Sequence, residues 1–252
     1  MGKEETLLKS RYRELAERAY RQNIYTYTSF LSVADQTALW EMEQELAYIS
    51  FCLFGGVEGT ERMVAAFGSE EIFGYREPFP ICCIHIMPLQ KKFAEELSHR
   101  DYLGALMHLG IERDVLGDIM VRNTDAYVFC LESMAEHIIN TVTRIRHTSV
   151  RCERLEKTPG FLSPHYVECQ DTVASRRIDV VVASVYHLSR SQTSVLFTEQ
   201  KISVDGRVNA NHSYLLKDGD TVSVRGYGRF IFERELSQTR KGKLLIAYRR
   251  PE

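Results

Sequence analysis

Residues 176–232 decide the fold of the C-terminal part of this chain: RRIDVVVASVYHLSRSQTSVLFTEQKISVDGRVNANHSYLLKDGDTVSVRGYGRFIF. At its start, apolar residues recur at the i, i+3, i+4, i+7 spacing of a helix that buries one face, namely at Ile178, Val181, Val182 and Val185. Ser175 is suited to cap this helix, and Ser189 is suited to cap a second one. The stretch therefore predicts two consecutive short helices.

After residue 200, apolar residues alternate with polar ones, which is the period of a half-buried strand. Ile202 and Val204 begin this pattern, and Val222 and Val224 resume it further on. The segment Asp218-Gly219-Asp220 between them is typical of a tight turn. The sequence thus predicts a small sheet of hairpin strands that follows the two helices.

Charge is divided unevenly along the chain. Residues 176–252 hold 14 Lys and Arg against 8 Asp and Glu, a formal balance of +6. Residues 1–175 hold 18 against 26, a balance of −8, and the net charge of −2 hides this division. A basic module attached to an acidic body is typical of a nucleic-acid-binding segment, and here it indicates RNA.

The same C-terminal stretch resembles the S4 RNA-binding domain. R-I-D opens the first helix, S-R-S opens the second, V-D-G lies in the hairpin, and G-D-T-V-S-V-R-G covers 219–226, in the order and at the spacing of that family. Gln200 departs from the family's usual Gly, the natural residue for a left-handed helix stop, and Asp205 replaces a common Asn. The resemblance implies an αL-type S4 fold whose two helices and adjoining strand edge grip structured RNA.

Seven residues match the RNA-facing positions of the S4 family. By this resemblance they are Arg177, Arg190, Ser191 and Gln192 on the helices, and Lys201, Arg225 and Arg229 near the strands. Guanidinium groups can hold a phosphate through two N–H groups, and Ser and Gln add short hydrogen bonds. For each residue taken alone, a solvated surface position is the alternative interpretation.

The acidic body is also predicted to combine helices and strands. Over 79–155 the patterns follow the order β-α-β-β-α-β of the ferredoxin-like fold, which RNA-recognition motifs share. Tyr127 and Phe129 are its strand aromatics, a sparse set that indicates RNA contact of low sequence selectivity. Before it we expect a helix over 3–22, a helix capped by Asp35, a strand in SFCLFGG at 50–56, and a short apolar helix after Arg62.

The predicted fold class is α+β, with four parts along the chain. They are an N-terminal α/β subdomain at 1–78, a central ferredoxin-like (RRM-like) subdomain at 79–155, a linking segment at 156–175, and the S4 domain at 176–252. Pro159-Gly160 and Ser163-Pro164 mark the linking segment, since such pairs favour turns and loops.

Outside the S4 stretch, HRDYLGALMHLGIERDVLGDIMV at 99–121 resembles the YlmH group of bacterial S4 proteins. The resemblance covers essentially the whole chain, and R-D-V-L-G-D-I at 113–119 is its most distinctive part. Genes of this group often lie in cell-division clusters, and the group has been tied to ribosome-associated quality control. The resemblance implies a cytoplasmic protein that binds rRNA of the large ribosomal subunit carrying a stalled peptidyl-tRNA, with tRNA as a further partner.

The sequence offers no motif for catalysis. His99-Arg100-Asp101 copies a kinase H-R-D without a Gly-rich loop or D-F-G, so Asp101 is interpreted as an acid at a helix N-terminus. FGGVEGTER at 54–62 lacks the P-loop Lys and is interpreted as a turn. Three histidines on apolar patterns are interpreted as core residues: His85, His108 and His137. No enzyme activity is therefore predicted.

Cysteine use and hydropathy narrow the class further. Of the six cysteines, 52, 82, 83 and 130 lie in apolar runs, and C-x-x-C is absent. We expect buried reduced thiols in the cytosol and no metal or cofactor. No apolar run is long enough to span a bilayer, so no membrane partner is predicted.

A non-enzymatic RNA-binding factor is the leading prediction, and two alternatives stay open. One is an RNA-modifying enzyme whose N-terminal body is a cryptic catalytic domain. The other is a cell-division adaptor whose acidic body docks a protein partner and for which RNA binding is accessory. A factor binds ribosomal particles without turnover, an enzyme changes the mass of its RNA, and an adaptor binds a division protein at high salt.

Overall fold

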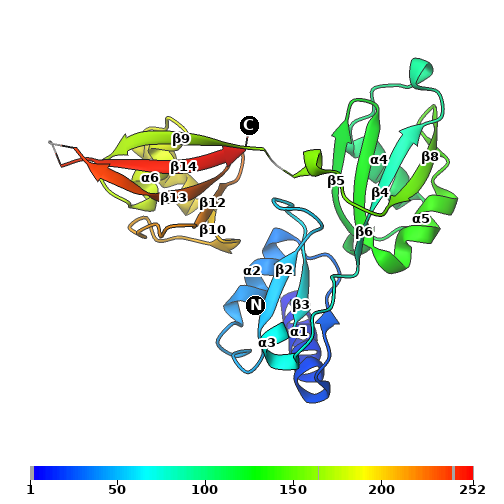
Figure 1. The fold of residues 1–252 in the computed structure, drawn as a ribbon, viewed down its shortest axis with the longest axis horizontal. Coiled ribbons are helices and arrows are strands. Elements are labelled where there is room, and N and C mark those ends of the chain that lie inside the picture. Colours follow the sequence, from blue (N-terminus) through cyan, green and yellow to red (C-terminus); the bar gives the residue numbers. More distant parts are fainter. Residues whose placement is uncertain (1–2, 164, 240–241, 252) are drawn as a thin grey trace. The chain divides into compact units, whose positions relative to one another are not determined.

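The computed structural model describes residues 3–163, 165–239 and 242–251 (Figure 1). The chain forms two compact units, Met1–Ser163 and Pro164–Glu252. Each combines helices with antiparallel sheets, so the fold class is α+β, as the sequence predicted.

The first part of the N-terminal unit is a three-stranded sheet in the order β1-β3-β2 with three helices. Its elements are α1 (Lys3–Gln22), β1 (Thr26–Tyr27), α2 (Val33–Glu41), β2 (Phe51–Phe54), β3 (Val64–Phe67) and α3 (Glu70–Phe73). The helix over 3–22 and the strand in SFCLFGG are confirmed. Asp35 is not the cap of α2: the cap is Ser32, whose backbone N–H and hydroxyl both donate to Asp35 Oδ2, at 3.0 and 2.6 Å.

Strand β3 corrects the expectation of a short helix after Arg62. All four of its side chains are buried, because β3 lies between β1 and β2 and is covered on both faces. A strand covered in this way is apolar throughout, and a run of four apolar residues shows no period that separates strand from helix.

The second part of the N-terminal unit is a five-stranded antiparallel sheet in the order β5-β6-β4-β8-β7. Its strands are β4 (Ile81–Pro88), β5 (Leu116–Arg122), β6 (Asp125–Leu131), β7 (Arg144–Ile145) and β8 (Thr148–Leu155); its α-helices are α4 (His99–His108) and α5 (Ala135–Thr141). Short 3-10 turns lie at η1 (Lys91–Phe93), η2 (Arg113–Val115), η3 (Glu132–Met134) and η4 (Gly160–Leu162). The predicted order of elements over 79–155 is observed, with β7 added where the sequence suggested more helix.

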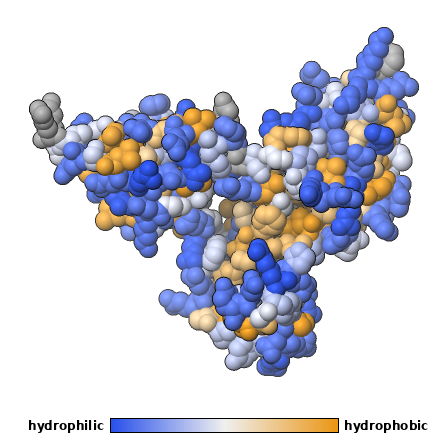
Figure 2. Space-filling model, in the orientation of Figure 1, coloured by the Kyte–Doolittle hydropathy of each residue, from blue (hydrophilic) through white to orange (hydrophobic). Residues whose placement is uncertain are grey.

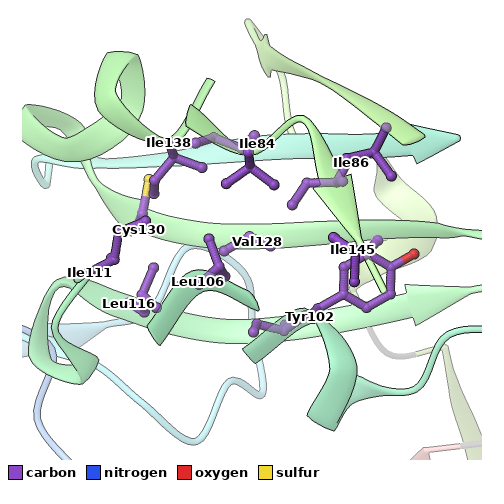
Figure 3. Packing of buried hydrophobic residues seen from close by; sticks show 14 of the residues in the cluster. Ile84, Ile86, Tyr102, Leu106, Ile111, Leu116, Val128, Cys130, Ile138 and Ile145 are labelled. Carbon is purple, nitrogen blue, oxygen red and sulfur yellow. The ribbon is translucent and has the colours of Figure 1, made fainter. Parts of the chain in front are cut away.

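One face of this sheet forms the main core of the unit. Ile84 of β4 and Val128 of β6 pack with Leu106 of α4 and Ile138 of α5, and all four side chains are fully buried. Figure 3 shows this cluster gathered between the strands and the helices. The helices therefore cover a single face of the sheet and leave the other to different partners.

The C-terminal unit is a six-stranded antiparallel sheet in the order β11-β10-β12-β13-β14-β9, with two helices. Its elements are β9 (Tyr166–Val173), α6 (Ile178–Val185), α7 (Arg190–Thr198), β10 (Ile202–Val204), β11 (Arg207–Val208), β12 (Thr221–Val224), β13 (Gly228–Gln238) and β14 (Leu244–Pro251). The helical stripe predicted at 178–185 is buried against the sheet, and the turn at 218–220 is confirmed.

Strand β9 occupies residues for which the sequence analysis expected a linking segment. It pairs along its whole length with β14, and yet in YVECQDTV Val173 alone is fully buried while Val167 is exposed. An edge strand held mainly by backbone pairing shows no clear alternation of apolar and polar residues, so its sequence does not predict a strand.

The start of α6 differs from the sequence prediction, while the end of α7 is closed without the Gly usual in the S4 family. α6 begins after Arg177, so Ser175 is not its cap, although its hydroxyl accepts from the Arg177 N–H at 3.4 Å. At the end of α7, Gln200 takes the left-handed conformation (φ +53°) that the family's usual Gly would favour. The Gln200 and Lys201 N–H groups donate to carbonyls of the last helical turn, which closes the helix despite the missing Gly.

None of the described helices combines the length and apolar character needed to cross a bilayer. On the face shown in Figure 2, hydrophilic residues cover most of each unit.

Candidate functional site

The N-terminal turn of α7 carries three of the predicted RNA-facing residues. Ser189 is the cap, as predicted, and its Oγ accepts from the Gln192 N–H at 3.3 Å. Gln192 Oε1 accepts from the Ser189 N–H and hydroxyl, both at 2.8 Å. The side-chain amide oxygen of Gln192 therefore stabilises the start of α7. Arg190 is exposed and forms no ion pair with a described residue.

Arg177 is already engaged within the unit. Its Nε and Nη2 donate to the two carboxylate oxygens of Asp179, at 3.1 and 2.7 Å. Burial opposes ionisation of Asp179, but the hydrogen bonds from Arg177 outweigh it and hold the pKa of that carboxyl below its ordinary value. A phosphate at Arg177 must therefore share the guanidinium with an ionised carboxylate.

Lys201 and Arg225 are neighbours in the fold. The Arg225 N–H donates to the Lys201 carbonyl at 2.8 Å, where β10 and β12 begin and end side by side. Arg225 is exposed, and the Lys201 ammonium pairs with Glu199 at 2.7 Å. Lys201 and Arg225 therefore lie near the C-terminal end of α7, whereas Arg190 lies at its N-terminal end.

Arg229 points away from the helices. The next residue, Phe230, is fully buried in the core between sheet and helices, and successive side chains of a strand point to opposite faces. The Arg229 guanidinium lies 5.7 Å from the centre of the Tyr166 ring, and the Arg249 guanidinium lies 5.5 Å from the same ring. The seven predicted residues thus fall on more than one face of the C-terminal unit.

The R-D-V-L-G-D-I segment at 113–119 joins the two parts of the N-terminal unit. Asp118 accepts from the backbone N–H groups of Glu61 and Arg62, at 2.7 and 3.1 Å. The Asp114 carbonyl accepts from the Phe30 N–H at 2.7 Å. A side chain on Gly117 would overlap the Phe30 ring, with carbon atoms within 3 Å.

Arg62 completes this junction. Its guanidinium donates to the carbonyls of Leu116, Phe30 and Arg113, at 2.9, 2.7 and 3.1 Å. Burial lowers the pKa of Arg62, against the attraction of Asp118. Sequence reasoning singled out the 113–119 segment but did not find Arg62, because the pairing joins residues more than 50 positions apart.

The second face of the central sheet is partly covered and partly open. Phe129 packs with Phe30 and Val64 of the first part, and a side chain on Gly56 would overlap the Phe129 ring. The predicted turn at 54–62 is confirmed, and it packs closely on Phe129 through Gly56.

The open part of that face carries an aromatic and charged cluster. The His85 and Tyr127 rings stack with centroids 4.6 Å apart and planes 6° apart, and Phe161 contacts Tyr127 edge-on at 5.4 Å. Asp125 Oδ2 lies 3.0 Å from His85 Nε2 and 3.4 Å from Lys91 Nζ. Burial opposes ionisation of Asp125, but hydrogen bonds from His85, Thr124 and Lys91 prevail and lower its pKa.

Two of the three histidines lie at the surface, and Asp101 of the H-R-D triplet lies at a helix start. His108 and His137 are exposed, so their assignment to the core was wrong, while His85 is half-buried. Asp101 accepts from the Ser98 N–H and hydroxyl at 2.8 and 2.7 Å, which confirms it as an acid at a helix N-terminus. Among the described residues, no three His, Cys, Asp or Glu side chains gather as metal ligands.

Comparison with known proteins relates this arrangement to a family. Residues 75–159 match the family described as "Putative RNA-binding domain in YlmH". Over these residues the chain is similar to YlmH. A relative from Bacillus subtilis (strain 168), named "Ribosome-associated protein quality control protein P2", is 26% identical over 240 residues, which are 95% of this chain and 91% of the relative.

The chain is also similar to a solved structure, "Cell division protein ylmH from Streptococcus pneumoniae": the match covers 62% of this chain and 93% of that one, with 19% identity and a TM-score of 0.49. The family match falls on the central sheet and its helices, outside the seven residues predicted to face RNA. It supports an RNA-binding role for the chain, and the seven residues stay a prediction.

Proposed function

We propose that this chain is a non-enzymatic RNA-binding protein that acts on the large ribosomal subunit during quality control of stalled peptidyl-tRNA. The observation that carries the proposal is the likeness over 95% of the chain to a relative named for ribosome-associated protein quality control. rRNA is the proposed main partner and tRNA a further one, in the cytoplasm. The acidic body is proposed to offer a surface for a protein partner.

The C-terminal unit is proposed to be an S4 domain that makes the rRNA contact. Two short helices followed by hairpin strands support this assignment, as does the formal balance of +6 over 176–252. Among the five predicted RNA-facing cations, Arg190 and Arg225 are exposed, whereas Arg177 and Lys201 share their charge with Asp179 and Glu199. Exposed Arg side chains suit phosphate contacts.

The body is proposed to be divided at 78/79, with a ferredoxin-like subdomain after it. The strand order β5-β6-β4-β8 and the order β-α-β-β-α-β support this assignment. On this view 1–78 is an α/β subdomain fixed to the sheet by Arg62 and Asp118.

Co-sedimentation with purified large ribosomal subunits over a salt series tests the proposal. Wild type is expected to bind with a logarithmic salt slope of about −0.7 to −0.9 per phosphate contact. Arg190→Glu should weaken binding and reduce the magnitude of the salt slope by about 0.7–0.9, the share of one phosphate contact. Arg18→Glu is the matched control, because it makes the same charge change at an exposed residue of α1.

Three outcomes would contradict the proposal. Equal binding by wild type, Arg190→Glu and Arg225→Glu would remove the C-terminal unit from the interface. Absence of binding by wild type at low salt would remove the large subunit as partner. A change of RNA mass after incubation would instead indicate a modifying enzyme.

A further inference from the structure

The open part of the central sheet contains a pocket that the C-terminal RNA surface does not use. Its volume is about 290 Å³, and its lining is largely polar. The lining residues are Lys91, Arg122, Asn123, Thr124, Asp125, Tyr127 and Phe161. β5, β6 and the turn between them supply five of these, while η1 and η4 supply one each.

Phe161 gives the pocket an exposed aromatic surface. Phe161 is 53% exposed, although the neighbouring Leu162 is buried and anchors η4 on the sheet. The ring meets Tyr127 edge-on, and Tyr127 is itself stacked on His85. An exposed ring held by packed neighbours is a ready stacking surface for a nucleobase, since every base has a π-face.

Two cations line the same pocket as the Phe161 ring. Arg122 is exposed and donates from Nη2 to the Phe161 carbonyl at 3.2 Å, and the Lys91 side chain is 70% exposed. Asp125 is the acid of the pocket, and it is engaged by Lys91 and by His85. Cations beside an exposed aromatic ring suit a base and its phosphate together.

We propose that this pocket binds one nucleotide of single-stranded RNA, with the base stacked on Phe161 and the phosphate held by Arg122 and Lys91. The inference rests on the proposed RNA-binding function and adds a second contact, outside residues 176–252. Double-stranded RNA does not fit the same role, because its bases are already stacked on one another. Phe161 lies beyond residues 75–159, so the family match does not assign it.

Fluorescence anisotropy of the full chain with a fluorescein-labelled oligouridylate octamer tests the pocket. Phe161→Leu keeps an apolar side chain but removes the ring, and should weaken binding by about tenfold. Arg122→Gln removes one phosphate contact and should reduce the salt slope by about 0.7. Two matched controls change exposed residues of α1: Tyr20→Leu and Arg18→Gln, each expected to bind as wild type does.

Photocrosslinking gives a second measurement that does not depend on altered variants. An octamer containing 4-thiouridine should yield adducts at Phe161 or Tyr127 of the wild-type chain, mapped by mass spectrometry. Adducts confined to residues 176–251, or Phe161→Leu binding the octamer as wild type does, would overturn the pocket. So would a failure of wild type to bind the octamer.

Ribosome binding separates this inference from the proposed function. Phe161→Leu that loses the octamer but still co-sediments with large subunits supports an independent nucleotide pocket. If wild type co-sediments and the octamer does not bind, the pocket is wrong and the proposed function stands. If wild type binds neither, both are wrong.

Discussion

Replacing Arg62 by Met should destabilise the N-terminal unit strongly. The guanidinium donates to three carbonyls, but the Leu116 carbonyl also accepts from Arg113 Nη1 at 2.9 Å and would keep a partner. The Arg113 carbonyl likewise keeps a donor, the Leu116 N–H, so among the described residues the Phe30 carbonyl alone would lose its hydrogen-bond partner, in a partly buried site. A buried polar group without its partner costs about 1–3 kcal/mol, while Met retains much of the stem packing. The expected loss in the free energy of unfolding is therefore about 1–3 kcal/mol.

The chain contains a convenient probe for this measurement. Its single tryptophan, Trp40, lies in α2 of the N-terminal unit, so its fluorescence follows the unfolding of that unit in urea. With a urea slope of about 2 kcal/mol per M, the midpoint should fall by about 0.5–1.5 M. Arg18→Met, at an exposed position of α1, is the control and should change the free energy by less than about 0.5 kcal/mol.

A midpoint for Arg62→Met within about 0.3 M of wild type would refute this reasoning, since even one unpaired carbonyl predicts a larger change. Arg62→Lys separates charge from geometry, because an ammonium on a flexible stem cannot reproduce the planar fork. The urea midpoint of Arg62→Lys should therefore lie closer to that of Arg62→Met than to that of wild type. Full stability in Arg62→Lys would show that charge alone is needed at this position.

Three further predictions use single residues. Gln200→Gly should stabilise the C-terminal unit by about 0.5–1 kcal/mol, measured by urea denaturation followed by circular dichroism. A non-Gly residue in the left-handed conformation costs about 1–2 kcal/mol, and Gly avoids this cost but loses more conformational entropy on folding, which offsets part of the gain. The pKa of Asp125 in the folded state is below its ordinary 3.8, so the stabilisation from its ionised carboxylate is present above about pH 4 and is lost as the pH falls through the folded-state pKa. The difference in urea midpoint between wild type and Asp125→Asn should therefore narrow from pH 6 to pH 3. Burial raises the pKa of Cys83 to about 12, so iodoacetamide at pH 8 should label the exposed Cys52 well before Cys83, as read by peptide mass spectrometry.

Local patterns predicted the helices of the C-terminal unit well. Ser189 and Gln192 form a capping box within four residues, and the stripe that begins at Ile178 repeats within two turns, so both signals are complete in a short window. β3 and β9 gave no such signal. A fully buried strand has no polar alternation, and an edge strand such as β9 depends on the pairing of β14, which lies some 80 residues further on.

The candidate site was less predictable for the same physical reason. The sequence marked the 113–119 segment as distinctive, but its role depends on Arg62 and Phe30, which come from another part of the chain. Phe161 fell in a segment expected to link two domains, and nothing in its neighbours indicates that it would pack against Tyr127. Sequence periodicity reports which face of an element is buried, and it does not report what covers that face.

The positions of Arg190 and Arg229 bear directly on how the C-terminal unit could hold RNA. Arg190 opens α7, whereas Arg229 lies on the sheet face opposite the buried Phe230. If one RNA segment contacts the helix face alone, Arg190→Glu should lower affinity and salt slope, and Arg229→Glu should leave both near the wild-type values. If the RNA wraps around the sheet edge, the two substitutions should act additively, since distant sites that share no contacts rarely couple. The double variant compared with the two single ones therefore measures how many faces of the unit take part, which the family resemblance alone leaves undecided.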